Sequence, residues 1–214
     1  MNAVEIEMPG AAVTASDRRS IRDQSFSDLD LQLSRRLDWR FLLANILLGD
    51  VAYIGEEKPF LVAALEKFSD RLTIVSQKTP EALPATFDLA VVTSTTGSDF
   101  EYASRILKGG GSIYVEMGST GVKARMAGLN VQRAALFAAG FHDVRTYWQR
   151  PSFEACREIV PLDDTPVLDY VLARQQADLA GKIKSMGARF ATKTGLLPLI
   201  VPSISLIAHK HSQP

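Results

Sequence analysis

The amino-acid sequence predicts an α/β fold: a doubly wound, mostly parallel sheet with a helical insert near the end of the chain. Short apolar runs alternate with longer stretches whose apolar residues recur at helical spacing. Repeated strand–helix–strand units of this kind fold as parallel sheets with right-handed crossovers. The chain has 214 residues, 46% of them hydrophobic, which suffices for one domain with a sizeable core.

The start of the chain is predicted to be an arm. Residues 1–30 are polar, mixed in charge and without a sustained apolar period, so neither a secretory signal nor a transit peptide is expected. The predicted organisation is an N-terminal arm over residues 1–36 and one domain over residues 37–214. Where the two meet, Trp39 and Phe41 are expected to be buried against the core.

Five apolar runs predict the parallel strands, over residues 51–55, 72–75, 87–92, 112–116 and 144–148. Runs that do not alternate with polar residues are typical of strands covered by helices on both faces. Residues 203–209 predict a last strand. Helical spacing predicts helices over residues 59–68, 100–107 and 122–139; the first begins at Pro59, and the last ends before Gly140.

Residues 151–197 interrupt the alternation and are predicted to form a helical insert. Prolines at positions 151, 161 and 166 bracket a loop, and a helical pattern follows from about residue 167 to residue 189. The apolar stretch of residues 196–208 is too short to cross a bilayer, so no transmembrane segment is expected.

The composition excludes several classes of protein. Lys plus Arg and Asp plus Glu both number 24, whereas dedicated nucleic-acid binders carry a clear basic excess. The single cysteine, Cys156, rules out an intramolecular disulfide and a cysteine-based zinc knuckle. We therefore expect a cytoplasmic protein without a nucleic-acid partner. From Arg174 onward, six basic residues face one acidic residue, which predicts either a solvated helix face or a surface for an anionic partner.

Candidate site residues follow from the predicted sheet. Ligands of open parallel sheets bind outside the carboxyl ends of the strands, near the point where the strand order reverses. The residues at those ends are Gly55 and Glu56, Ser76 and Gln77, residues 93–96, and residues 116–119.

Other chemical signals are few. No Gly-x-Ser-x-Gly or Walker-type loop occurs, which excludes a serine hydrolase or a P-loop NTPase. His209 and His211 are expected at a frayed, solvated chain end, so no metal site is predicted. Cys156 is expected to be a buried or inert thiol.

An aromatic group marks the start of the insert and consists of Tyr147, Trp148, Pro151 and Phe153. Two interpretations remain open. The group either anchors the insert by packing or forms an aromatic wall that faces a substrate.

Three segments, in this order of elements, carry a resemblance: residues 87–92 (FDLAVV), residues 103–116 (ASRILKGGGSIYVE) and residues 139–145 (AGFHDVR). They resemble the fourth strand, the L-K-x-G-G turn with the fifth strand, and the A-G-F-x-x-V entry to the sixth strand of class I S-adenosylmethionine-dependent methyltransferases. Residues 204–210 resemble the family's last, antiparallel strand. The resemblance covers about residues 48–210 and implies a Rossmann-like fold.

The sequence departs from the family at three places. The first loop, Gly55-Glu-Glu-Lys-Pro, has one of the usual three glycines. The second strand ends in Ser76 and Gln77, where the family has an acid that binds the ribose hydroxyls. About twelve residues separate this strand from Phe87, so the family's third strand and its flanking helices are expected to be missing.

The resemblance implies S-adenosylmethionine as cofactor, no metal and a small-molecule acceptor. The residues implied for cofactor binding are Gly55, Glu56, Gln77, Asp88, Thr93, Ser94 and Thr95; no catalytic residue is assigned. Gly55 would lie against the methionine part, Gln77 near the ribose and residues 93–95 at the reacting centre. Asp88, at the base of a strand, also fits a purely structural role.

The departures support a second hypothesis. The chain would then be a pseudoenzyme: a non-catalytic scaffold or partner subunit that has lost its cofactor and binds a protein partner or a second copy of itself. A nucleotide-binding oxidoreductase is disfavoured, because the sequence has no G-x-G-x-x-G loop.

Overall fold

The structure is a computed structural model that describes residues 28–75, 85–93, 96–117, 122–174 and 201–212. Its centre is a seven-stranded sheet in the order β2-β1-β3-β4-β7-β5-β6. The strands are β1 (Asp50–Ile54), β2 (Arg71–Val75), β3 (Phe87–Val92), β4 (Leu107–Met117), β5 (Phe141–Arg150), β6 (Glu158–Pro161) and β7 (Ile204–Lys210).

The pairing confirms the predicted mostly parallel sheet. β1 is parallel to β2 and to β3, and β3 is parallel to β4. β7 lies between β4 and β5 and is antiparallel to both, so β5 runs in the same direction as β4. This is the Rossmann-like, class I methyltransferase-like fold that the resemblance implied, including its antiparallel last strand. β2 is an edge strand of the described sheet, as expected if the family's third strand is missing.

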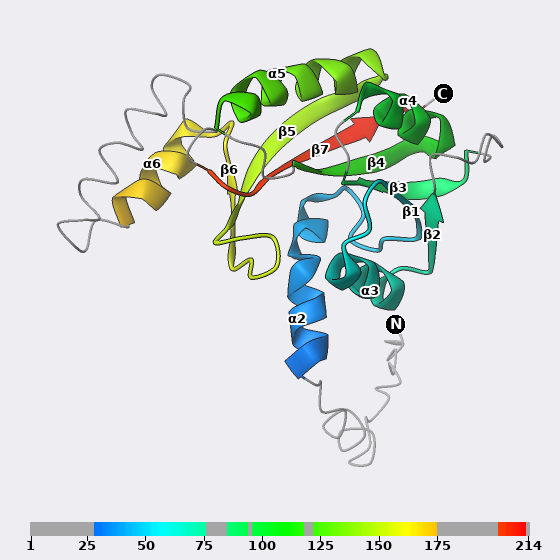
Figure 1. Ribbon diagram of the computed structural model, residues 1–214, viewed down its shortest axis with the longest axis horizontal. Coiled ribbons are helices and arrows are strands. Elements are labelled where there is room, and N and C mark those ends of the chain that lie inside the picture. Colours follow the sequence, from blue (N-terminus) through cyan, green and yellow to red (C-terminus); the bar gives the residue numbers. More distant parts are fainter. Residues whose placement is uncertain (1–27, 76–84, 94–95, 118–121, 175–200, 213–214) are drawn as a thin grey trace, which may run out of the picture.

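Helices cover both faces of the sheet (Figure 1). One face carries α2 (Asp28–Arg36), the 3-10 helix η1 (Asp38–Leu42) and α3 (Pro59–Phe68). The other face carries α4 (Gly97–Ile106) and α5 (Val122–Ala138), while α6 (Thr165–Arg174) lies next to β6. The part of the chain covered by these ranges contains no helix long and apolar enough to cross a membrane.

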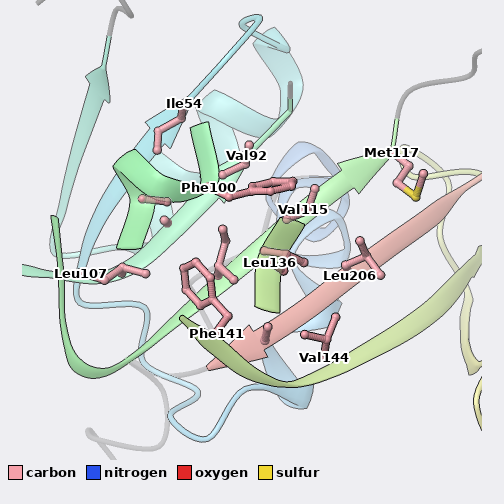
Figure 2. Packing of buried hydrophobic residues seen from close by; sticks show 14 of the residues in the cluster. Ile54, Val92, Phe100, Leu107, Val115, Met117, Leu136, Phe141, Val144 and Leu206 are labelled. Carbon is pink, nitrogen blue, oxygen red and sulfur yellow. The ribbon is translucent and has the colours of Figure 1, made fainter. Parts of the chain in front are cut away.

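Alternate residues along the strands pack into two separate hydrophobic cores, one on each face of the sheet. On β1, Val51 and Tyr53 face α2 and α3, whereas Ala52 and Ile54 face α4 and α5. Figure 2 shows the second core, in which Phe100 of α4 and Leu136 of α5 meet side chains of the strands. The uninterrupted apolar character of the runs thus reflects burial on both faces of the sheet.

Local signals placed the start of α3 and the end of α5 correctly, whereas the helix predicted over residues 100–107 spans Gly97–Ile106. Pro59 stands in the first turn of α3, where its missing N–H costs nothing. Gly140 follows α5 with a φ of +88°, the left-handed conformation in which glycine commonly ends a helix.

Of the two aromatic residues expected in the core, only one is buried. Trp39 is 1% exposed and stacks on Tyr114, with ring centroids 3.8 Å apart. The prediction for Phe41 is wrong, because its side chain is 59% exposed. In the tight helix η1, residues two positions apart point to different sides, and Phe41 lies instead against the guanidinium of Arg40.

The insert and the chain end differ in part from expectation. The insert begins with an unpredicted strand, β6, which pairs antiparallel with β5 at the edge of the sheet. α6 matches the start of the predicted helix, and residues 175–189 of that helix lie outside the described residues. The expectation of a frayed end at His209 is wrong, because this residue belongs to β7 between two strands.

Candidate functional site

The strand order reverses between β1 and β3, because the chain leaves β1 for β2 on one side and continues with β3 on the other. Gly55 and Glu56 follow β1 at this point, and Thr93 follows β3. The Thr93 N–H donates to the carbonyl of Ile54 at 3.0 Å, and its hydroxyl donates to the carbonyl of Glu56 at 2.8 Å. Three of the predicted cofactor residues therefore meet where open α/β sheets bind ligands.

Two hydrogen bonds of Tyr53 in β1 hold the first loop in place. The Tyr53 hydroxyl donates to the carbonyl of Glu56 at 2.7 Å and accepts the N–H of Lys58 at 3.1 Å. Gly55 has a φ of +116°, which a residue with a side chain rarely adopts. Within the described residues, the N–H groups of Gly55, Glu56 and Glu57 donate to no acceptor.

A buried carboxylate, Glu116, lies at the carboxyl end of β4. Its side chain is fully buried and forms two ion pairs, with Arg36 Nη2 at 2.6 Å and with Lys58 Nζ at 2.9 Å. The Tyr114 hydroxyl donates a third contact to the carboxylate at 2.9 Å. We call Arg36, Lys58 and Glu116 the ion cluster. A buried charge needs such partners to offset its loss of hydration.

Burial and charge shift the pKa values of the neighbouring groups. Burial opposes the charged form of Arg36, but the adjacent carboxylate of Glu116 outweighs it and holds the pKa of the guanidinium above its ordinary value. Burial, together with the same carboxylate, raises the pKa of Tyr114 well above its ordinary value. Tyr114 therefore stays a protonated hydrogen-bond donor.

The polar contacts continue from the ion cluster across the sheet. Gln149 of β5 donates through Nε2 to the Tyr114 hydroxyl at 2.7 Å and to Ser205 Oγ of β7 at 3.0 Å. Three neighbouring strands are thus joined by side chains, and the Tyr114 ring is held on its face by Trp39.

Phe153, in the segment between β5 and β6, packs against Arg36 and Lys58 of the ion cluster. This side chain is 8% exposed, and its ring centroid lies 5.7 Å from the guanidinium carbon of Arg36 and 5.4 Å from Lys58 Nζ. Figure 1 shows this segment beside α2. Phe153 is thus a packing anchor of the insert, and it takes this role at the carboxyl edge of the sheet.

Among the described residues, the predicted site residue Asp88 does not join this group. Asp88 lies at the amino end of β3, where it accepts the N–H of Asp50 at 2.9 Å and Lys108 Nζ at 2.7 Å. Burial alone would raise the pKa of this carboxyl, but these two donors outweigh it and hold the pKa below its ordinary value. The cofactor role predicted for Gln77, Ser94 and Thr95 stays a prediction, because these residues lie outside the described part of the chain.

Sequence reasoning missed most of the ion cluster. Glu116 was named only as a position after a strand, although a single acid that ends an apolar run is itself a signal. Arg36 belongs to the predicted arm, and nothing in the neighbouring sequence distinguishes it from Arg35. Only the packing of α2 on the sheet brings Arg36 to Glu116.

The remaining candidates are inert or lie elsewhere. Cys156 is buried, and burial raises the pKa of its thiol, as expected for an unreactive cysteine. His209 forms a hydrogen bond between its Nδ1 and Ser112 Oγ at 3.0 Å, near the amino end of the strands. The described residues contain no group of three or more His, Cys, Asp or Glu side chains that lie close enough together to hold a metal ion. Lys210, the last of the basic tail, donates to the carbonyls of Ser104 and Leu107.

No model of a protein family and no curated protein matches this chain. Among solved structures, the chain is similar to a SAM-dependent methyltransferase from Archaeoglobus fulgidus, with 11% identity and a TM-score of 0.48 over 90% of this chain and 99% of that one. It is also similar to phosphoethanolamine N-methyltransferase 2 of Haemonchus contortus, with 14% identity and a TM-score of 0.46 over 84% of this chain. A SAM-dependent methyltransferase from Thermotoga maritima shows 11% identity and a TM-score of 0.43 over 84% of this chain and 89% of that one. The chain spans about half (53%) of the Haemonchus enzyme. Similarities at this level carry no information about activity.

Proposed function

We propose that the protein is an S-adenosylmethionine-dependent methyltransferase that acts on a small-molecule acceptor at the carboxyl edge of β1, β3 and β4. The observation that carries this proposal is the contact between the first loop and Thr93 at the point where the strand order reverses, where the Thr93 hydroxyl donates to the carbonyl of Glu56, the residue after Gly55. Proteins with open α/β sheets generally bind their ligands at this point.

The residues present fit such a cofactor. Gly55 lacks a Cβ, so a ligand can come close to its backbone. The N–H groups of residues 55–57, which have no acceptor within the described residues, are free to bind a carboxylate. When bound, the cofactor supplies an electrophilic methyl group.

The chain would contribute position rather than acid–base chemistry. Tyr53 and Thr93 both donate to the carbonyl of Glu56, so the first loop is fixed before any ligand arrives. Phe153 and α2 close one side of the carboxyl edge and shield Arg36 and Glu116 from water. Holding two reactants in line is sufficient to accelerate a transfer that needs little proton movement.

The test is a thermal-shift titration of the purified protein with S-adenosylmethionine and S-adenosylhomocysteine. A ligand at one hundred times its dissociation constant stabilises the folded state by about 2.7 kcal/mol. For a domain of this size, that is a rise in Tm of about 5–11 °C. An unchanged Tm at millimolar concentrations of both ligands would refute the proposal.

One observation favours the second candidate function, a non-catalytic scaffold. The carbonyl of Glu56 and the N–H of Lys58 are already satisfied by side chains of the protein, which makes the first loop stable without a ligand. If the protein is a scaffold, its Tm should not change in the titration. A native mass measurement should then detect a second copy of the chain or a protein partner.

A further inference from the structure

The ion cluster contains two cations and one carboxylate. Glu116 is fully buried and Arg36 is 1% exposed on its side chain, so both charges lie away from water. Buried charges are usually matched by opposite charges and hydrogen bonds. Here the buried charges of Arg36 and Glu116 balance each other, and the one positive charge in excess is that of the partly exposed Lys58. Both Nη atoms of Arg36 are buried without a hydrogen bond of normal geometry within the described residues.

The excess charge is exposed to solvent at Lys58. Its side chain is 32% exposed, whereas those of the other two members of the cluster are closed off. An ammonium group has three N–H donors, and Glu116 Oε2 accepts one of them at 2.9 Å. Lys58 also immediately precedes α3, so the N-terminal end of that helix adds a favourable field for an anion.

The backbone of Lys58 belongs to the first loop, two residues after Glu56, whereas its ammonium group reaches the carboxylate of Glu116 near the end of β4. Gly55 and Thr93 follow β1 and β3, whereas Glu116 ends β4 and Phe153 comes from the segment after β5. The excess charge therefore faces the half of the carboxyl edge that lies away from β2. A reactant bound there would be a second molecule next to the one bound at Gly55.

We propose that the acceptor carries an anionic group, a phosphate or a carboxylate, which binds to Lys58 in the field of Arg36. This inference rests on the proposed methyl transfer, since it identifies the class of acceptor for the same site. The ring of Phe153 packs against Lys58 and holds its ammonium group in place.

The test measures anion binding without any methyl transfer. Inorganic phosphate and acetate are titrated into the full-length protein at constant ionic strength, and binding is followed by NMR shift changes and by Tm. Constant ionic strength is needed because salt screens exposed charges. Binding of either anion supports the inference, and the tighter of the two identifies the group on the acceptor.

The variant Lys58→Gln should weaken anion binding by about tenfold or more, because a charge-assisted hydrogen bond is lost. The matched control is Lys67→Gln. Lys67 lies on α3, the helix that Lys58 precedes, is similarly exposed and pairs with Asp30 of α2, so its replacement removes the same charge away from the cluster. The control should bind phosphate or acetate as the unmodified protein does. Equal weakening in both variants would overturn the inference, as would the absence of binding.

The same titration is repeated with S-adenosylmethionine present. Additive stabilisation is expected if the anion and the cofactor occupy neighbouring positions. Competition would show that the charge serves the carboxylate of the cofactor and would overturn the assignment to the acceptor. Binding of the cofactor with no anion binding would refute only this inference. Anion binding with no binding of the cofactor would refute the proposed methyl transfer, and the anion could then no longer be assigned to an acceptor.

Discussion

Arg36, the last residue of α2, lies with its Nη2 atom 2.6 Å from Oε1 of Glu116 near the end of β4. This contact fixes α2 to the carboxyl edge of the sheet. It also connects the first loop to the same point, because Lys58 binds the second oxygen of the carboxylate.

Replacing Arg36 should therefore destabilise the whole domain. Arg36→Ala leaves a fully buried carboxylate with one cation instead of two, and loss of one partner of a buried ion pair costs about 3–5 kcal/mol. Urea unfolding measures this difference. Arg35→Ala is the control, because Arg35 is exposed on the same helix and its replacement should change stability by about 0.5 kcal/mol or less. Equal effects of the two variants would show that the ion pair contributes nothing specific.

The left-handed backbone at Gly55 should matter for ligand binding beyond its effect on stability. Gly55→Leu introduces both strain and a side chain at the carboxyl edge, so binding of S-adenosylhomocysteine should be lost in calorimetry. Gly140→Ala introduces comparable strain at the end of α5, where φ is +88°, and should leave binding unchanged. If Gly55→Leu still binds the ligand, the pocket lies elsewhere.

The packing of α5 on the sheet predicts that two neighbouring residues of this helix contribute very differently to the free energy of unfolding. Leu136 is fully buried, whereas the side chain of Phe137 is 52% exposed. Leu136→Ala should cost about 2–5 kcal/mol because it leaves a cavity, and Phe137→Ala should cost far less. Denaturant unfolding of the two variants checks this orientation of α5. A larger cost for Phe137→Ala would mean that the helix is rotated.

Stability should fall with acidification because of His209. Burial, more than its charged neighbours, lowers the pKa of this imidazole below its ordinary value of about 6.5. Between the lowered pKa and about 6.5 the unfolded chain binds more protons than the folded one, so stability rises with pH in that window and is lost as the pH falls through it. His209→Gln should flatten this slope in urea unfolding measured at a series of pH values. A slope that survives the substitution would contradict the assignment to His209.

The strands and most helix ends could be predicted from local patterns. Val51 to Ile54 form one apolar run because both faces of β1 are covered, and Gly140 ends α5 because few other residues adopt its backbone conformation. Phe41 shows the limit of such patterns. Its type predicted burial, but its direction depends on the tight turn of η1.

The candidate site was predictable only where it follows directly from strand ends. Gly55, Glu56 and Thr93 follow β1 and β3, so the parallel sheet necessarily brings them to one edge. Asp88 was placed at the start of its strand, and it accordingly lies at the amino end with Asp50 and Lys108.

The alternation of apolar runs and helices was enough to specify a mostly parallel α/β sheet, because burial on two faces and on one face leaves different periods in a sequence. The ion cluster left no such period. Arg36, Lys58 and Glu116 come from an N-terminal helix, a loop and a strand end, and a pairing between distant segments depends on how helix and sheet pack in three dimensions. The charge of each residue could be read along the chain, but its partner and its burial were set by that packing.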